Sequence, residues 1–157
     1  MEDSTIRKIK SYLRYEPTTG KIYRKDGVRP LGWNDAYGYT LVYVDKKYYT
    51  AHRLAFILMG HPLPTQVDHI NGDKSDNRWC NLRPSTHATN QFNKGKQARN
   101  KSGYKGVTWD KNAKKWKSQI GIDGRVIFLG YFDCPKAAHE SYKVGAKKYH
   151  GDFRRYE

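Results

Sequence analysis

A polar, basic stretch divides the chain into two parts. Residues 94–103 read KGKQARNKSG, in which Ala98 alone is apolar and basic side chains recur throughout. Such a stretch is typical of a linker that can lie along a phosphate backbone, and a solvated loop is the alternative. We therefore divide the 157 residues into a first domain at 1–93, a basic linker at 94–103 and a second domain at 104–157.

The basic charge is concentrated in the linker and the second domain. The chain has 30 Lys and Arg against 15 Asp and Glu, which gives a formal net charge of +15. Residues 94–157 contribute +10 of this excess, and residues 1–93 contribute +5. A positive field of this strength attracts polyanions, so nucleic acid is the first expected partner and an anionic membrane surface the second.

The sequence also limits the compartment and the cysteine chemistry. It contains no run of roughly 18 apolar residues, and its start, MEDSTIRKIK, has no apolar stretch of the signal-peptide type. We therefore expect a soluble, intracellular protein. Cys80 and Cys134 cannot form a disulfide framework, and neither has the CxxC or paired His of a zinc site. Both are expected to be core thiols.

The first domain alternates between helical and strand-like patterns. Ile6, Ile9 and Leu13 recur at helical spacing before the turn sequence at 17–20. Further strands are predicted at 21–24, 39–44, 48–51 and 67–70, and further helices at 52–59 and 85–93. This mixture predicts an α+β class.

The second domain has a simpler pattern. Three strands are predicted at 106–109, 116–122 and 126–132, separated by polar turns. A helix follows, with Asp133 as its candidate N-cap and Pro135 in its first turn. Its apolar stripe, which includes Ala138, Tyr142 and Ala146, is expected to pack on the sheet.

Asp68, His69 and Asn90 could together support phosphodiester hydrolysis. A carboxylate and an amide oxygen suit a hard ion such as Mg²⁺, and an imidazole can take a proton from water. Asp68 and His69 are adjacent, so they share a site only if the strand ends or bends at the 71–72 turn. A surface turn with a hydrogen-bonded His69 is the alternative. The spacing after Asp68 does not fit an EF-hand calcium loop.

Several motifs in the first domain resemble those of HNH endonucleases, in particular free-standing phage homing endonucleases. The motifs are AHRLA at 51–55, DHING at 68–72, DNR at 76–78, NLR at 81–83 and NQFN at 90–93. The resemblance implies a ββα-metal module preceded by a sheet and helix extension over about 50 residues. It also implies that His69 is the general base, that Asn81 holds the hairpin loop, and that Asp68 and Asn90 bind Mg²⁺ or Mn²⁺.

The second domain is similar to AP2 (ERF-type) DNA-binding domains. The matching residues include GYKGV at 103–107, FLGYF at 128–132, Trp109 and Trp116. The resemblance implies a three-stranded antiparallel sheet with one helix, whose sheet face reads DNA. The expected DNA contacts are Lys105, Thr108, Trp109, Lys114, Trp116, Lys117, Gln119 and Arg125. For Trp109 and Trp116 a place in the core is an equal alternative.

These patterns predict a metal-dependent DNA endonuclease targeted to double-stranded DNA by the second domain. The resemblance to phage enzymes implies a location in the cytoplasm of the host cell, and no membrane partner is expected. One active site per chain favours a nick and a monomer on DNA, whereas a double-strand break would need a dimer or two successive events. A non-catalytic DNA-binding regulator with the HNH fold and an RNA-binding or RNA-cleaving protein are the alternatives.

Overall fold

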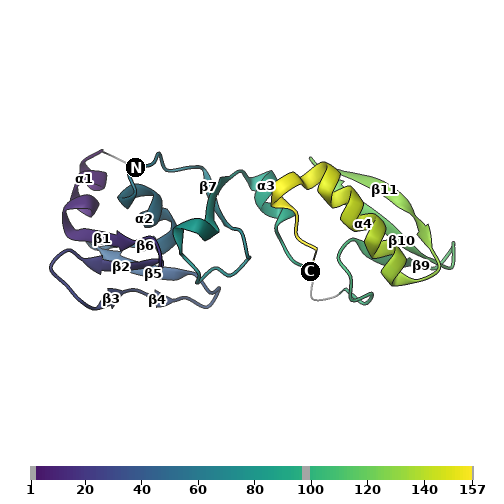
Figure 1. Cartoon of the computed structure of the whole chain (residues 1–157), viewed down its shortest axis with the longest axis horizontal. Coiled ribbons are helices and arrows are strands. Elements are labelled where there is room, and N and C mark those ends of the chain that lie inside the picture. Colours follow the sequence, from purple (N-terminus) through teal and green to yellow (C-terminus); the bar gives the residue numbers. More distant parts are fainter. Residues whose placement is uncertain (1–2, 97–99, 157) are drawn as a thin grey trace. The chain divides into compact units, whose positions relative to one another are not determined.

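The computed structural model describes residues 3–96 and 100–156, which form helices and several small antiparallel sheets (Figure 1). This architecture is compatible with the predicted α+β class. The backbone divides into two compact units, Met1–Thr86 and His87–Glu157. The division therefore falls before residues 87–93, which the sequence pattern assigned to the first domain.

From residue 3 to residue 86, the first unit contains three antiparallel sheets and two helices. In chain order its elements are α1 (Asp3–Tyr12), β1 (Leu13–Glu16), β2 (Lys21–Arg24), β3 (Pro30–Leu31), β4 (Trp33–Asn34), β5 (Thr40–Val44), β6 (Lys47–Thr50), α2 (Ala51–Leu58), β7 (Gln66–His69), the 3₁₀ turn η1 (Trp79–Asn81) and β8 (Leu82–Ser85). The strand orders are β1-β2-β3, β4-β5-β6 and β7-β8.

The two helices of the first unit lie on the same side of its strands (Figure 1). Ile9 of α1, Val42 of β5 and Leu54 of α2 are almost fully buried in one apolar cluster. A second cluster joins α2 to the β7–β8 hairpin through Phe56 and Leu82. Because α2 contributes to both clusters, it anchors the hairpin to the rest of the unit.

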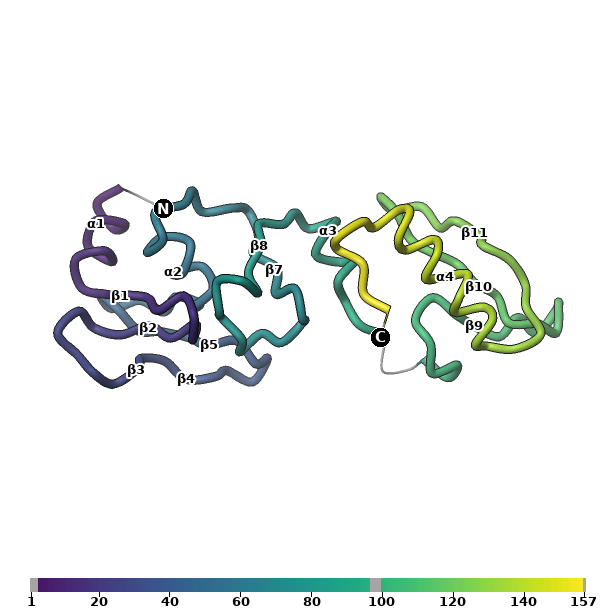
Figure 2. Tube along the Cα trace, viewed as in Figure 1, coloured from purple at the N-terminus to yellow at the C-terminus, as the bar shows by residue number. Residues whose placement is uncertain are grey.

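The β7–β8 hairpin is connected by a long polar loop, which can be followed in Figure 2. The strands pair antiparallel, with Asp68 opposite Arg83 and His69 opposite Leu82. The loop is tied back to the N-terminal strands, because the Tyr15 hydroxyl donates to the Asn77 carbonyl at 2.7 Å. The Trp79 amide also donates to the Pro17 carbonyl at 2.9 Å. The N-terminal extension therefore supports the loop directly.

Within residues 87–96 and 100–156, the second unit contains one sheet and three helical elements. These are α3 (His87–Phe92), β9 (Val107–Asp110), β10 (Lys115–Ile122), β11 (Arg125–Phe132), α4 (Pro135–His150) and the 3₁₀ turn η2 (Gly151–Phe153). The sheet is antiparallel with the order β11-β10-β9, and α4 lies across one of its faces (Figure 1). Ala138, Tyr142 and Ala146 of α4 are buried, and Tyr142 and Ala146 pack with Ile120 of the sheet, which confirms the predicted packing stripe.

Two predictions about the cysteines and the α4 cap were wrong. The N-cap of α4 is Cys134, whose Sγ accepts from the Ala137 amide at 3.4 Å, and Asp133 lies one residue earlier. Both Cys80 and Cys134 are free and exposed, so neither is a core thiol. The physical reason is their position: Cys134 stands where the chain enters a helix, and Cys80 lies in the surface turn η1.

Candidate functional site

The last two residues of β7, Asp68 and His69, are both only 4 % exposed. β7 runs through His69 in regular register, so neighbouring side chains project to opposite faces of the strand. Accordingly they have different surroundings: Asp68 contacts Arg83, whereas His69 lies near Tyr39 and His52. The structure thus places both residues at the predicted position but gives each its own partners.

Asp68 forms a buried ion pair with Arg83. The Arg83 Nε and Nη2 atoms both donate to Oδ2 of Asp68, at 2.8 and 2.6 Å. The Arg83 side chain is only 15 % exposed. Pairing is what makes a carboxylate tolerable at this depth, because an isolated buried charge would be strongly destabilising. Sequence reasoning missed Arg83 as a site residue, although it lies in the NLR motif opposite Asp68.

The orientation of Asn77 determines which nitrogen of His69 carries a hydrogen. The Asn77 Nδ2 atom donates to Thr40 Oγ1 at 3.1 Å and to the Ser75 carbonyl at 3.0 Å. A carbonyl can only accept, so the amide oxygen of Asn77 must be the atom that lies 3.2 Å from His69 Nε2. His69 therefore donates from Nε2, and in the neutral ring the basic nitrogen is Nδ1.

Burial controls the charge of His69. Removal from water lowers its pKa below the ordinary value, while the hydrogen bond to Asn77 and the charge of Asp68 oppose that shift. The net effect is a lowered pKa of His69, which favours the neutral imidazole. A neutral ring can accept a proton, which is the property that a general base requires.

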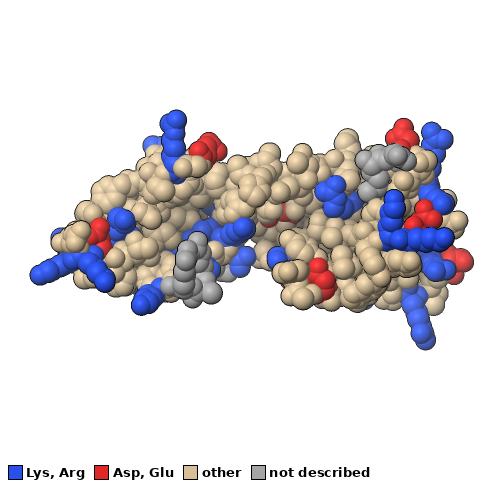
Figure 3. Space-filling model, turned by 180° about the vertical axis from the view of Figure 1, so that it is seen from behind, with Lys and Arg blue, Asp and Glu red and all other residues tan. Residues whose placement is uncertain are grey.

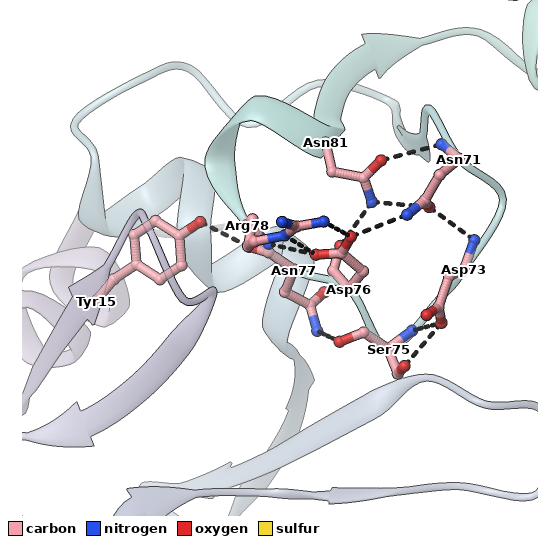
Figure 4. Close-up of polar contacts among 8 residues, drawn as sticks. All are labelled: Tyr15, Asn71, Asp73, Ser75, Asp76, Asn77, Arg78 and Asn81. Carbon is pink, nitrogen blue, oxygen red and sulfur yellow. Dashed lines mark hydrogen bonds and ion pairs between the residues drawn. The ribbon is translucent and has the colours of Figure 1, made fainter.

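Asn81 holds the loop between β7 and β8 by three hydrogen bonds (Figure 4). Its Oδ1 accepts from the Asn71 amide at 3.0 Å, and its Nδ2 donates to Asn71 Oδ1 at 3.0 Å and to the Asp76 carbonyl at 2.8 Å. Asn81 is 6 % exposed, so these bonds satisfy a buried amide. This geometry is the one that a loop-holding role for Asn81 requires, and its effect on catalysis stays a prediction.

His52 is a second buried imidazole beside His69. It is the second residue of α2 and is 8 % exposed, and its ring centroid lies 5.1 Å from that of His69 in an edge-to-face arrangement. Burial, with smaller contributions from His69 and Arg53, lowers the pKa of His52 to about 3. His52 is therefore neutral at physiological pH and adds no positive charge next to His69.

Asn90, the predicted partner of Asp68, lies on α3 in the second compact unit. The pairing of Asp68 with Asn90 stays a prediction. Among residues 3–96 and 100–156 there is no group of three or more His, Cys, Asp or Glu side chains that could hold a metal ion. The predicted donor set, one carboxylate and one amide, is not a group of that type. It suits a hard ion that keeps most of its waters.

The second unit presents one sheet face away from α4. Directly opposite residues share a face, so the register places Thr108, Lys117 and Tyr131 in one row and Gln119 beside Phe128 in the next. Phe128 and Tyr131 are 55 % and 45 % exposed. We call this surface the open face. Phe128 and Tyr131 were not among the contacts expected from the sequence, because an apolar strand such as β11 is equally typical of a buried core.

The other expected DNA contacts lie elsewhere in the second unit. Trp109 pairs with Trp116 on the face that α4 covers, and Arg125 falls on that same face at the hairpin end of β11. Lys114 is exposed in the β9–β10 turn with a φ of 51°. Lys105 is partly buried, and its Nζ donates to the Phe92 carbonyl at 2.8 Å. The eight expected contacts therefore do not all lie on one sheet face, but five of them line one cavity: Lys105, Thr108, Trp109, Trp116 and Gln119.

Comparison with known proteins relates the hairpin region to a nuclease family. Residues 49–92 match the HNH endonuclease family. This HNH segment runs from the end of β6 to the end of α3 and contains Asp68, His69, Asn81 and Asn90. It supports the predicted resemblance for that part of the chain.

A relative and a search of solved structures complete the comparison. The chain is 27 % identical to Protein 3.8 of Escherichia phage T7 over 97 residues, which is 60 % of this chain and 79 % of that protein. No solved structure matches the chain. None of the helices in the described part of the chain has the length and apolar character needed to cross a bilayer.

Proposed function

We propose that the chain is a metal-dependent DNA endonuclease that hydrolyses phosphodiester bonds and is directed to DNA by its second unit. One observation carries the proposal: the HNH segment contains a buried histidine, His69, whose ring is oriented by Asn77. Asn81 holds the adjoining loop in place. A non-catalytic relative would have no need for this orientation.

His69 acts as the general base in the proposed reaction. With Nε2 donating to Asn77, the Nδ1 atom takes the proton from the attacking water. Asn77 keeps the ring in that orientation throughout, because its own amide is anchored to Thr40 and Ser75. The expected cleavage product carries a 5′-phosphate.

Asp68 and Asn90 are the proposed ligands of a Mg²⁺ or Mn²⁺ ion. Both supply hard oxygen atoms, and the burial of Asp68 beside Arg83 keeps that carboxylate available in one orientation. When bound, the ion would polarise the scissile phosphate and stabilise the leaving 3′-oxygen. The absence of a thiolate or a cluster of imidazoles among the proposed ligands argues against a soft ion.

The proposed DNA-binding surface of the second unit is its open face. Thr108, Lys117 and Gln119 lie there, beside exposed aromatic rings that increase the contact area. Lys and Arg side chains are also exposed on each unit taken by itself (Figure 3). An AP2-like mode of targeting fits the open face but gives no role to Trp109, Trp116 or Arg125, which lie on the α4 side.

A nicking assay tests the proposed function. Purified full-length protein is incubated with supercoiled plasmid carrying its native target, in Mg²⁺ or in EDTA, and product ends are tested for 5′-phosphate. His69→Ala should reduce nicking at least 100-fold, whereas His61→Ala, which removes an exposed imidazole from the same unit, should not. Undiminished nicking by His69→Ala would refute the assigned base. DNA binding without cleavage would indicate the regulator, and RNA cleavage in a parallel assay would indicate an RNA enzyme.

A further inference from the structure

A pocket in the second unit has an unusual concentration of positive charge. It has a volume of about 880 Å³, and five lysines line it: Lys94, Lys96, Lys101, Lys105 and Lys111. None of the described lining residues is Asp or Glu. We call this cavity the linker pocket, because four of the lysines belong to the segment between α3 and β9.

Most of this charge has no internal counterion. Lys96 and Lys105 donate to backbone carbonyls, those of Gly103 and Phe92. Lys94, Lys101 and Lys111 are exposed, and within the described residues none of them forms an ion pair. Five cationic groups around one cavity attract a ligand with several negative charges, such as consecutive phosphates.

The sheet side of the linker pocket is suited to a nucleobase. Thr108, Gln119 and Val126, from the open face, line it together with Gly121. Val126 is 66 % exposed and offers an apolar surface, while the Gln119 amide can both donate to and accept from a base edge. A simple inorganic anion would use the lysines but not this surface.

The size of the pocket favours a single strand over a duplex. Cavities of roughly 300–1,000 Å³ enclose ligands of drug size, which is the size of one or two nucleotides. A duplex keeps its bases stacked inside and is read by an element that enters its groove, about 12 Å wide in the major groove. Proteins that hold unpaired nucleotides combine a positively charged groove with aromatic side chains, and Trp109 and Trp116 line this pocket together with its lysines.

We propose that the linker pocket binds a short stretch of single-stranded DNA, with phosphates on its lysines and a base against Gln119 and Val126. This inference rests on the proposed function for its choice of nucleic acid. It assigns the part of the open face next to the linker to an unpaired strand. Lys117, Phe128 and Tyr131 do not line the pocket and remain for the duplex.

Binding measured without cleavage tests this site. Full-length protein in EDTA is titrated into fluorescein-labelled dT12 and into a labelled 12-base-pair duplex, with fluorescence anisotropy as the readout. The pocket variant Lys94→Gln/Lys101→Gln/Lys111→Gln is compared with Lys136→Gln/Lys147→Gln/Lys148→Gln. The second set removes the same charge from exposed positions on α4 that do not line the pocket. Thermal melting checks that both variants are folded.

The pocket variant should bind dT12 at least tenfold more weakly than the α4 variant. Its plot of log affinity against log salt concentration should be shallower by about 2, since each lost single-strand phosphate contact removes roughly 0.7. Its duplex affinity should stay within about threefold of the α4 variant. Equal losses in the two variants, an equal loss for duplex, or no dT12 binding by the wild type would overturn the proposal.

The outcome is separable from that of the proposed function. His61→Ala should bind dT12 as tightly as the wild type, because His61 is not in the pocket. A chain that binds dT12 through the linker pocket yet never nicks DNA would refute the nuclease and keep the single-strand site. A chain that nicks plasmid but shows no pocket-dependent dT12 binding would refute the single-strand site and keep the nuclease.

Discussion

Asp68 and Arg83 form the ion pair that is most completely removed from water among the described residues. Arg83→Ala would leave the buried carboxylate without its partner, and we expect the free energy of unfolding to fall by about 3–5 kcal/mol. Urea denaturation of the full chain in EDTA measures this change. Asp68→Asn combined with Arg83→Met should cost less than the single variant, because neither buried charge remains.

Arg78 provides the matched control for Arg83. Its Nη2 lies 2.6 Å from Asp76 Oδ2, the same distance as in the buried pair, but the Arg78 side chain is 51 % exposed. Solvent screens an exposed pair, so Arg78→Ala should lower the free energy of unfolding much less than Arg83→Ala does. A similar loss for Arg78→Ala and Arg83→Ala would mean that burial does not determine the strength of these pairs.

Lys105 predicts a pH dependence of stability in the second unit. Burial, with a smaller repulsion from Arg155, lowers the pKa of Lys105 to about 8 in the folded chain. The ordinary pKa of a lysine is 10.5, so between about pH 8 and pH 10.5 Lys105 carries more protons in the unfolded chain than in the folded one. Across that window Lys105 therefore makes the free energy of unfolding rise with pH. Below pH 8 the full cost of the buried cation is present.

Lys105→Met isolates this contribution from the other titrating groups. The variant should be more stable than the wild type by roughly 1–3 kcal/mol at pH 7, and the difference should shrink as the pH rises from 8 to 10. Urea denaturation at several pH values, followed by near-ultraviolet circular dichroism, measures the gap. If the difference in free energy of unfolding between Lys105→Met and the wild type stays constant with pH, the charge of Lys105 does not destabilise the folded state.

At the scale of elements, Gly106 fixes how α4 approaches β9. Its φ is +74°, and a Cβ at this position would overlap the ring of Tyr142, a buried residue of α4. Gly103 has a similar φ of +77° but nothing within 4 Å of its Cβ position. Gly103→Ala should therefore cost about 1 kcal/mol for backbone strain, and Gly106→Ala about 2 kcal/mol more.

Thermal unfolding of the two glycine variants measures the difference. Both substitutions force alanine into the left-handed region, so the strain common to both cancels in the comparison. What remains is the overlap with Tyr142. Equal melting temperatures for the two variants would mean that α4 can move away from β9 at no cost, and that the contact does not set the helix position.

The elements that the sequence predicts well are those with a long and regular pattern. The three strands of the second unit begin and end within one residue of their predicted limits, and its helix begins at Pro135, which was predicted to lie in the first turn. Alternation and an apolar stripe define these elements in the sequence. β3 and β4, of two residues each, were missed, since a pattern of period two needs more length. β1 was also missed, because Leu13 continues the helical spacing of Ile6 and Ile9.

The candidate site was predictable as a set of residues but not as a set of contacts. The motifs identify Asp68, His69 and Asn81, and the structure places all three on the β7–β8 hairpin and its turn. The sequence motifs do not indicate that Asn77 orients His69, because that contact depends on how the loop folds back. The face on which Trp109 and Trp116 lie likewise depends on strand register, which alternation alone leaves open.

At the scale of the whole molecule, charge and chemistry are separated along the chain. The linker and the second domain carry net +10, while the segment that matches HNH endonucleases lies before residue 93. A charge excess of this kind strengthens binding in a strongly salt-dependent way and does not itself cleave a bond. Substrate capture and hydrolysis should therefore respond to different substitutions, as the pocket and His69 variants are designed to show.

The number of active sites per chain predicts the order of products. One HNH segment is present, so a chain acting alone should cut one strand at a time. With protein below the plasmid concentration, open circles should accumulate first, and linear DNA should follow only as nicked circles are bound again. A gel time course at several protein concentrations measures both products. Linear DNA that appears from the first time point, with a rate that rises as the square of protein concentration, would instead require two chains at one target.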